Sequence, residues 1–322
     1  MEVSLQELTR ESQILLNKMH RALAYIRLMR PANIITSLAD ILLGFAASGA
    51  AIQLLKKQEW NYGMAEFVNL YFLLVSSACL YGAGVVLNDF FDLEIDKTER
   101  PERPLPKGNV SVQGALLLGI ILSATGITVA FFVSILSGLI SVLIVCLSLL
   151  YNKYSKNHAF WGPLNMASCR MGNLMLGLTV IPDFRMDGIW LLMIPLIYIG
   201  SVTLLSQGEV TGTEKKRIET SLLLYILLLI FILNLSFLDR FSLLYSLPFL
   251  ILFILFSLPG IIKAMKHPGQ PLLIRKAVKN SILGLILLDA SLIAGFTGLS
   301  FGLLVVLLLP LSIILAKTFA VS

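Results

Sequence analysis

The chain has 322 residues, of which 57% are hydrophobic and only 14% are charged, and its mean hydropathy is +0.86. A soluble domain of this length needs many more charges on its surface, so the composition excludes an ordinary soluble protein. The net charge of +6 does not indicate nucleic-acid binding, because the charges lie in short segments between long apolar blocks. The sequence therefore predicts an integral, multi-pass membrane protein whose surroundings are the lipid bilayer and that has no nucleic-acid partner.

The N-terminal segment 1–30 lacks the apolar stretch and the small-residue cleavage site of a signal peptide. Drawn as a helix, it places apolar side chains on one stripe: Leu15, Leu16, Met19, Leu23 and Ile26. This pattern is typical of an amphipathic helix that lies on a membrane surface.

Apolar blocks of membrane-crossing length follow along the rest of the chain. They cover residues 33–55, 68–88, 113–132, 134–151, 160–182, 188–207, 219–238, 241–262, 278–297 and 299–317. Each is close to the roughly 20 residues that a helix needs to cross the hydrocarbon core, and open strand edges cannot be satisfied in lipid. The last block follows a weak turn at 298–300, so it is either a tenth helix or part of one broken helix. We predict an all-α bundle of nine or ten transmembrane helices, forming a single domain over residues 1–322.

Basic residues fall mostly on one side of the membrane when the chain is threaded through these blocks. With a cytoplasmic N-terminus, the inner side receives all 25 Lys and Arg except Lys56, Lys57, Arg170, Arg185 and Arg240. The positive-inside rule therefore predicts a cytoplasmic N-terminus. The large polar segments then face the cytoplasm, and we expect a central cavity open to that side and laterally to lipid. We expect the membrane to be the bacterial inner membrane.

Acidic residues mark the cytoplasmic end of the second block. Asn88, Asp89, Asp92 and Asp96 recur at about one helical turn, so they should stack on one face. Stacked carboxylates repel unless a cation lies between them, and such hard oxygen ligands suit Mg²⁺. A solvated helix end is the alternative. We favour a metal and diphosphate site because the acids begin inside an apolar helix, where ionisable groups are costly, and because bases follow at once: Lys97, Arg100, Arg103 and Lys107.

Residues 88–108, NDFFDLEIDKTERPERPLPKG, resemble the first Asp-rich motif of the UbiA-type membrane prenyltransferases. The segment Arg30–Asn33 is similar to the family's RPxN motif, and Tyr151–Lys156 with Asn165, Arg170 and Asn173 resembles its connection between the fourth and fifth helices. The resemblance implies a UbiA-like enzyme that uses Mg²⁺ to transfer an isoprenoid from its diphosphate to a small or aromatic acceptor.

The same resemblance implies a set of site residues. The catalytic carboxylates would be Asp89, Asp92, Asp96 and Glu209, and the metal ligands would be these four with Asn88 and Glu214. The substrate contacts would be Asn33, Asn88, Arg100, Arg103, Lys153, Lys156, Arg170 and Asn173.

The second motif departs from the family's pattern. The family usually places two Asp residues four positions apart at the end of the sixth helix, whereas this chain has Glu209 and Thr213, with Glu214 one position later. Threonine offers only a neutral oxygen. The second metal site is therefore weakened, rebuilt around Glu214, or lost. The sequence of residues 206–212, together with Val278–Lys279 and residues 287–290, resembles the UbiA-like group called EboC. For that group, the acceptor is not assumed to be a quinone precursor.

Two other functions stay open at this point. The altered second motif would also suit a protein that binds a prenyl or lipid diphosphate with little or no turnover. A transporter would use midplane polar groups as well, but it needs functional charges at both membrane faces.

Three charged residues are predicted at similar depth inside the bilayer: Asp40, Arg170 and Asp289. An unpaired charge there is costly, so we expect a buried ion pair or triad. It would serve either as a structural clamp or as a polar contact for the acceptor.

Overall fold

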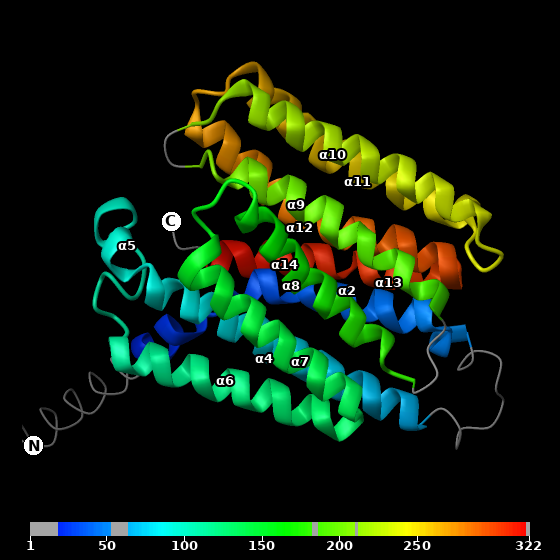
Figure 1. The fold of residues 1–322 in the computed structure, drawn as a ribbon, viewed down its shortest axis with the longest axis horizontal. Coiled ribbons are helices and arrows are strands. Elements are labelled where there is room, and N and C mark those ends of the chain that lie inside the picture. The colour runs from blue at the N-terminus through cyan, green and yellow to red at the C-terminus, as the bar shows by residue number, and fades with distance from the viewer. Residues whose placement is uncertain (1–18, 53–63, 182–185, 210–211, 320–322) are drawn as a thin grey trace, which may run out of the picture.

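The computed structural model describes residues 19–52, 64–181, 186–209 and 212–319, and all regular structure in these ranges is helical. Figure 1 shows the long helices side by side in an elongated bundle. After a helical stretch at residues 19–28, the elements are α2 (Pro31–Ser48), α4 (Met64–Phe91), α5 (Leu93–Glu99), α6 (Val112–Val133), α7 (Ile135–Leu150), the π-helix η2 (Tyr151–Ser155), α8 (Trp161–Leu178), the 3-10 turn η3 (Met186–Leu192), α9 (Met193–Ser206), α10 (Lys215–Asn234), the 3-10 turn η4 (Leu235–Phe237), α11 (Leu243–Lys266), α12 (Pro271–Thr297), α13 (Leu299–Val306) and α14 (Leu308–Thr318).

Nine helical spans among the described residues are long and apolar enough to cross a membrane. This confirms the predicted all-α, multi-pass fold. Helix α8 is not one of the nine, because Asn165, Arg170 and Asn173 lower its apolar content. It nevertheless packs inside the bundle against α2, α7 and α9. The block predicted at 160–182 is therefore an internal helix that carries polar groups into the core.

The predicted break near residue 298 separates two helices. Gly298 has φ +95°, a conformation that favours glycine, and its N–H donates to the Ala294 carbonyl at 2.8 Å. The chain then turns back, so that α13 packs on α12 and α14 packs on α2. The last block is thus a separate span and not a continuation of the ninth block.

Helices α2 and α12 form the centre of the bundle. Over an 18-residue apolar stretch of each helix, 67% of α2 and 83% of α12 are buried inside the protein, against 17% for the outer helix α6. Helix α2 approaches α8 at a glycine contact, where a Cβ on Gly44 would lie 2.5 Å from the Gly177 carbonyl carbon. Any larger residue at Gly44 would push the two helices apart. These two central helices also supply one end each to the cavity described below.

The helical stretch at 19–28 packs one face against the polar end of the bundle. Ala24 and Leu28 are buried with Val86 and Leu105, while Met19 and Ile26 are exposed. Leu15 and Leu16 of the predicted stripe lie outside the described residues. That this segment lies on a membrane surface stays a prediction.

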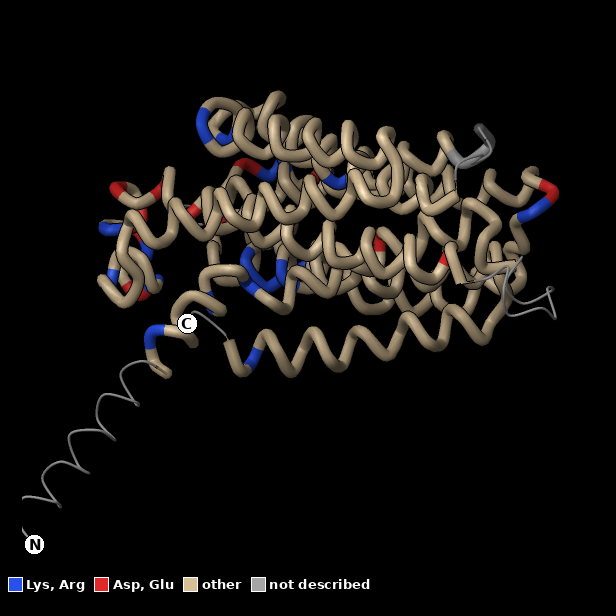
Figure 2. The backbone as a smooth tube through the Cα atoms, turned by 90° about the horizontal axis from the view of Figure 1, so that it is seen from below, with Lys and Arg blue, Asp and Glu red and all other residues tan. Residues whose placement is uncertain are grey.

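Charged residues gather at the end of the bundle where α5 lies (Figures 1 and 2). The start of α10, the start of α12 and the end of α14 lie at the same end. This agrees with the predicted grouping of the large polar segments on one side. Which side of the membrane that end faces stays a prediction.

Candidate functional site

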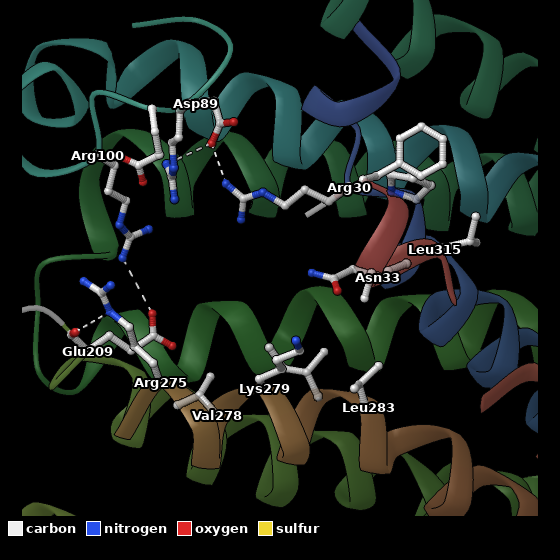
Figure 3. A pocket seen from close by; sticks show the side chains of 17 residues that line it. Arg30, Asn33, Asp89, Arg100, Glu209, Arg275, Val278, Lys279, Leu283 and Leu315 are labelled. Carbon is white, nitrogen blue, oxygen red and sulfur yellow. Dashed lines mark hydrogen bonds and ion pairs between the residues drawn. The ribbon is translucent and has the colours of Figure 1, made fainter. Parts of the chain in front are cut away.

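A cavity of about 400 Å³ opens at the charged end of the bundle. Its walls come from α2, α4, α12, α14 and two loops, and Figure 3 shows the labelled side chains around it. It is lined by Arg30, Pro31, Ala32, Asn33, Asp89, Arg100, Glu102, Arg103, Glu209, Arg275, Val278, Lys279, Ile282, Leu283, Leu315, Ala316 and Phe319. The fold therefore brings Asp89 of the first motif and Glu209 of the second into one chamber.

Two carboxylates of the first motif share one guanidinium. Arg103 Nη1 lies 3.1 Å from Asp89 Oδ1 and 2.5 Å from Asp96 Oδ2. Asp89 Oδ1 also accepts a hydrogen bond from Arg30 Nη2 at 2.6 Å. Both carboxylates are only 3% exposed, so their charges depend on these partners. The positive charge that stacked acids require is supplied here by arginine.

The other two members of the motif face a different neighbour. Asn88 Nδ2 donates to Asn152 Oδ1 at 3.2 Å, and Asp92 forms an ion pair with Lys156. A turn at Asp92 separates α4 from α5. The four side chains therefore have two sets of partners: Asp89 and Asp96 meet Arg103, whereas Asn88 and Asp92 meet Asn152 and Lys156. That the four act together as ligands of a metal ion stays a prediction.

Burial shifts the pKa of three of these groups, Asp96, Arg103 and Lys156. It raises the pKa of Asp96, although Arg103 acts in the opposite direction. Burial and the neighbouring Arg30 lower the pKa of Arg103. Burial also lowers the pKa of Lys156. The charges at this end of the bundle are thus partly withdrawn from water, where ion pairing and phosphate binding gain strength.

Among the described residues of the second motif, only Glu209 lines the cavity. Its Oε2 lies 3.6 Å from Arg100 Nη2, and its backbone carbonyl accepts a hydrogen bond from Arg275 Nε at 2.8 Å. Burial raises the pKa of this carboxyl, while Arg100 and Arg275 lower it. Neither Thr213 nor Glu214 lines the cavity. The Thr213 backbone N–H donates to the Pro268 carbonyl at 3.0 Å.

Three further bases line the cavity that the sequence did not single out as site residues: Arg30, Arg275 and Lys279. Arg30 opens the RPxN segment, which was a usable signal. Arg275 and Lys279 are four positions apart on α12, so they lie on one helical face. Hydropathy did not indicate this face because the apolar block begins only at 278, which leaves Arg275 outside the predicted helix.

The predicted substrate contacts divide into two groups. Asn33, Arg100 and Arg103 line the cavity. The remaining predicted contacts do not line it: Asn88, Lys153, Lys156, Arg170 and Asn173. Lys153 Nζ lies over the Tyr154 ring, 5.1 Å from its centre. The substrate roles of these residues stay predictions.

A buried polar network joins α2 to α8. Arg170 Nη1 lies 2.9 Å from Asp40 Oδ2, and Arg170 Nη2 donates to Thr36 Oγ1 at 2.8 Å. Asn173 Nδ2 donates to the same Asp40 oxygen at 3.0 Å. The predicted buried ion pair is confirmed, and its polar groups are used within the protein, which favours the structural clamp. Asp289 Oδ2 is buried without a hydrogen-bond partner among the described residues.

The acids supply the oxygen ligands that Mg²⁺ prefers, and two of them lie close enough to share one cation. The described residues contain no group of three or more His, Cys, Asp or Glu arranged to hold a metal ion. The reason is that Asp89, Asp92 and Asp96 are each turned toward a base. Two of these carboxylates nevertheless converge on a single nitrogen, Arg103 Nη1, which shows that one cation can contact both.

Comparison with known proteins gives the class to which this fold and site belong. The model of the UbiA prenyltransferase family matches residues 42–274, which include both motifs. The chain belongs to the UbiA prenyltransferase family. This confirms the family resemblance and the prediction of a prenyltransferase-type enzyme.

Its curated relatives include several archaeal proteins named digeranylgeranylglyceryl phosphate synthase. That of Thermococcus kodakarensis is 28% identical over 198 residues, covering 61% of this chain and 67% of the relative. That of Saccharolobus solfataricus is 28% identical over 262 residues, covering 74% and 86%. The match to the Methanococcoides burtonii protein is 37% identical but spans only 39% of that relative. The resemblance to EboC and the bacterial inner membrane stay predictions.

Solved structures of two relatives share the fold. One, from work on digeranylgeranylglyceryl phosphate synthase in membranes, superposes with a TM-score of 0.63 at 20% identity, over 86% of this chain and 99% of that one. The other, a UbiA homologue from Archaeoglobus fulgidus bound to DMAPP and Mg²⁺, gives 0.54 at 15% identity, over 91% and 99%. At such identities they show the shared architecture alone.

Proposed function

We propose that this chain is a Mg²⁺-dependent intramembrane prenyltransferase, whose cavity faces the cytoplasm and transfers an isoprenoid from its diphosphate to an acceptor. The observation that carries the proposal is the cavity itself. It combines carboxylates from both motifs with five bases at the mouth and an apolar wall farther in. An isoprenyl diphosphate has the same division between a polyanionic head and an apolar tail.

The bases suit the leaving diphosphate. Arg30 lies on the Asp89 side, Arg275 and Lys279 lie on the Glu209 side, and Arg100 reaches from the Asp89 side toward Glu209 (Figure 3). Arg103 contacts Asp89. Negative charge accumulates on the diphosphate as the allylic C–O bond breaks, and fixed positive groups stabilise that charge. Lys156 contacts Asp92 and would act by holding that carboxylate in place.

Mg²⁺ would be held by the carboxylates of Asp89, Asp92 and Asp96, with Asn88 and Glu209 completing the oxygen set. When bound it would neutralise diphosphate oxygens and improve the leaving group. Binding requires the carboxylates to exchange their present bases for the ion. The two carboxylates that already share Arg103 Nη1 are the best placed for this exchange.

The apolar wall suits the isoprenoid chain. Val278 precedes Lys279 on α12, Ile282 and Leu283 follow it, and Leu315 of α14 lines the same cavity. These side chains keep water from the allylic carbon once the C–O bond has broken, which favours attack by the acceptor. The acceptor loses a proton as the new bond to this carbon forms.

The acceptor is the second substrate of the proposed reaction. The family resemblance implied a small or aromatic molecule. The names of the archaeal relatives refer to a glyceryl phosphate lipid, and they favour an acceptor of that lipid class for this chain.

The test is transfer by purified protein in lipid nanodiscs, with radiolabelled isoprenyl diphosphates and both classes of acceptor. We expect a labelled product that requires Mg²⁺ and is lost in Asp89→Asn. Metal-dependent binding without product would support the non-catalytic diphosphate binder instead. A transporter would move substrate across sealed vesicles, an activity that membership of a prenyltransferase family argues against.

A further inference from the structure

We propose that this chain binds its diphosphate with a single divalent ion, and that Arg275 and Lys279 of α12 supply the charge of a second ion. The inference rests on the proposed function and concerns how the head group of its substrate is held. An arginine and a lysine together carry the same charge as one Mg²⁺.

The second motif is too poor in carboxylates to hold an ion of its own. Glu209 is the only one of its described members that lines the cavity, and this carboxylate forms an ion pair with Arg100. Glu214 is exposed at the start of α10, outside the cavity lining. One carboxylate beside a neutral threonine is a weak site for Mg²⁺, which dehydrates reluctantly and is held through carboxylates and phosphate oxygens.

Two bases of α12 line the cavity without an ion-pair partner among the described residues. Arg30, Arg100 and Arg103 each form an ion pair with Asp89, Asp96 or Glu209. Lys279 and Arg275 form no ion pair within the described part of the chain, and Arg275 is tied only to the backbone carbonyl of Glu209. These two residues therefore carry surplus positive charge into the cavity.

Their position is where the second motif would otherwise place a metal ion. Arg275 touches Glu209 directly, and Lys279 lies one helical turn farther along the same face of α12 (Figure 3). Ile282 and Leu283 follow on the apolar part of that face. A diphosphate held between Asp89 and α12 would thus meet metal-binding acids on one side and free bases on the other, with its tail directed along α12.

The experiment measures metal stoichiometry and affinity without turnover. Purified protein is titrated with Mn²⁺ and an unreactive prenyl thiodiphosphate, free Mn²⁺ is measured by electron paramagnetic resonance, and ligand binding by calorimetry. We expect one Mn²⁺ per chain in the ternary complex. Lys279→Gln should weaken thiodiphosphate binding about tenfold, the size of one charge-assisted contact, and Arg275→Gln should add a similar loss. The Mn²⁺ stoichiometry should stay at one in both variants.

Two controls separate the charge at the site from general effects. Lys276→Gln removes an exposed base from the same helix that does not line the cavity, and it should bind like the wild type. Lys279→Arg keeps the charge and should restore most of the affinity. Because Lys279 has no ion-pair partner in the described ranges, its variants test the idea even if Arg275→Gln fails to fold.

The outcomes are distinct. Two Mn²⁺ ions per wild-type chain, or wild-type affinity in Lys279→Gln, would overturn the inference and leave the proposed function standing. A wild-type protein that binds no thiodiphosphate with Mn²⁺ would overturn both.

Discussion

Replacing Arg103 by glutamine removes the guanidinium shared by Asp89 and Asp96. Asp89 keeps Arg30 at 2.6 Å, but Asp96 loses the partner that lies 2.5 Å away. The side chains of Arg103 and Asp96 are 10% and 5% exposed, so water compensates little of the loss. Leaving one buried charge without its partner costs about 3 kcal/mol at the lower end of measured cases. We expect a lower thermal unfolding midpoint for Arg103→Gln in EDTA.

Magnesium should reverse much of this loss if the pair of carboxylates is the ion site. In the wild type, an incoming ion has to displace Arg103, whereas in the variant it meets two carboxylates with less competition. An ion that binds only the folded state stabilises it, and more strongly when its affinity is higher. The rise in midpoint on adding Mg²⁺ should therefore be larger in Arg103→Gln than in the wild type.

The assay is thermal unfolding of detergent-purified protein by tryptophan fluorescence, with EDTA and over a series of Mg²⁺ concentrations. Lys107→Gln is the matched control, because Lys107 is an exposed base of the same loop. Its midpoint and its Mg²⁺ response should equal those of the wild type. Equal Mg²⁺ responses in Arg103→Gln and the wild type would refute the assignment of the ion to these carboxylates.

Three further outcomes are expected. Asp92→Asn should abolish Mg²⁺-dependent binding of a prenyl thiodiphosphate by the folded protein; calorimetry that shows unchanged metal dependence would remove Asp92 from the site. Burial raises the pKa of Glu209, so as the pH falls this carboxylate takes up a proton, and releases Mg²⁺, at a higher pH than an ordinary glutamate would. Curves of Mg²⁺ binding against pH should show this release, and Glu209→Gln should remove that step. Arg170→Leu leaves Asp40 buried without its ion-pair partner and should cost about 3 kcal/mol of stability; unchanged thiodiphosphate and acceptor affinity in the folded protein would support the clamp, and a selective loss of acceptor binding would contradict it.

Hydropathy predicted most of the fold because each span is defined by a long apolar run. The block at 113–132 corresponds to α6 at Val112–Val133, and the block at 241–262 to α11 at Leu243–Lys266. The prediction was weakest for α12, which begins at Pro271, seven residues before its block. Three bases lie within the first nine residues of α12, Arg275, Lys276 and Lys279, and they lower the hydropathy of its start so that the apolar block begins only at 278.

The meeting of the two motifs was also predictable, but the pairing of charges was not. The family resemblance put Asp89 and Glu209 in one site, and the cavity contains both. Which base meets which acid depends on rotation about each helix axis, and a few tens of degrees direct Asp92 to Lys156 while Asp96 meets Arg103. A spacing of one turn does not resolve such differences.

The observed pairing explains how one site can be rich in acids and in bases. In a low-dielectric bundle neither set of charges is stable alone, and Asp89, Asp92, Asp96 and Glu209 are each paired with a base. A diphosphate that enters with Mg²⁺ carries both kinds of partner: its oxygens can take the arginines, and the ion can take the released carboxylates. This exchange keeps the number of paired charges nearly constant, so we expect it to cost little. Either ligand alone would leave one set without partners, and we therefore expect Mg²⁺ and diphosphate to bind with strong mutual dependence.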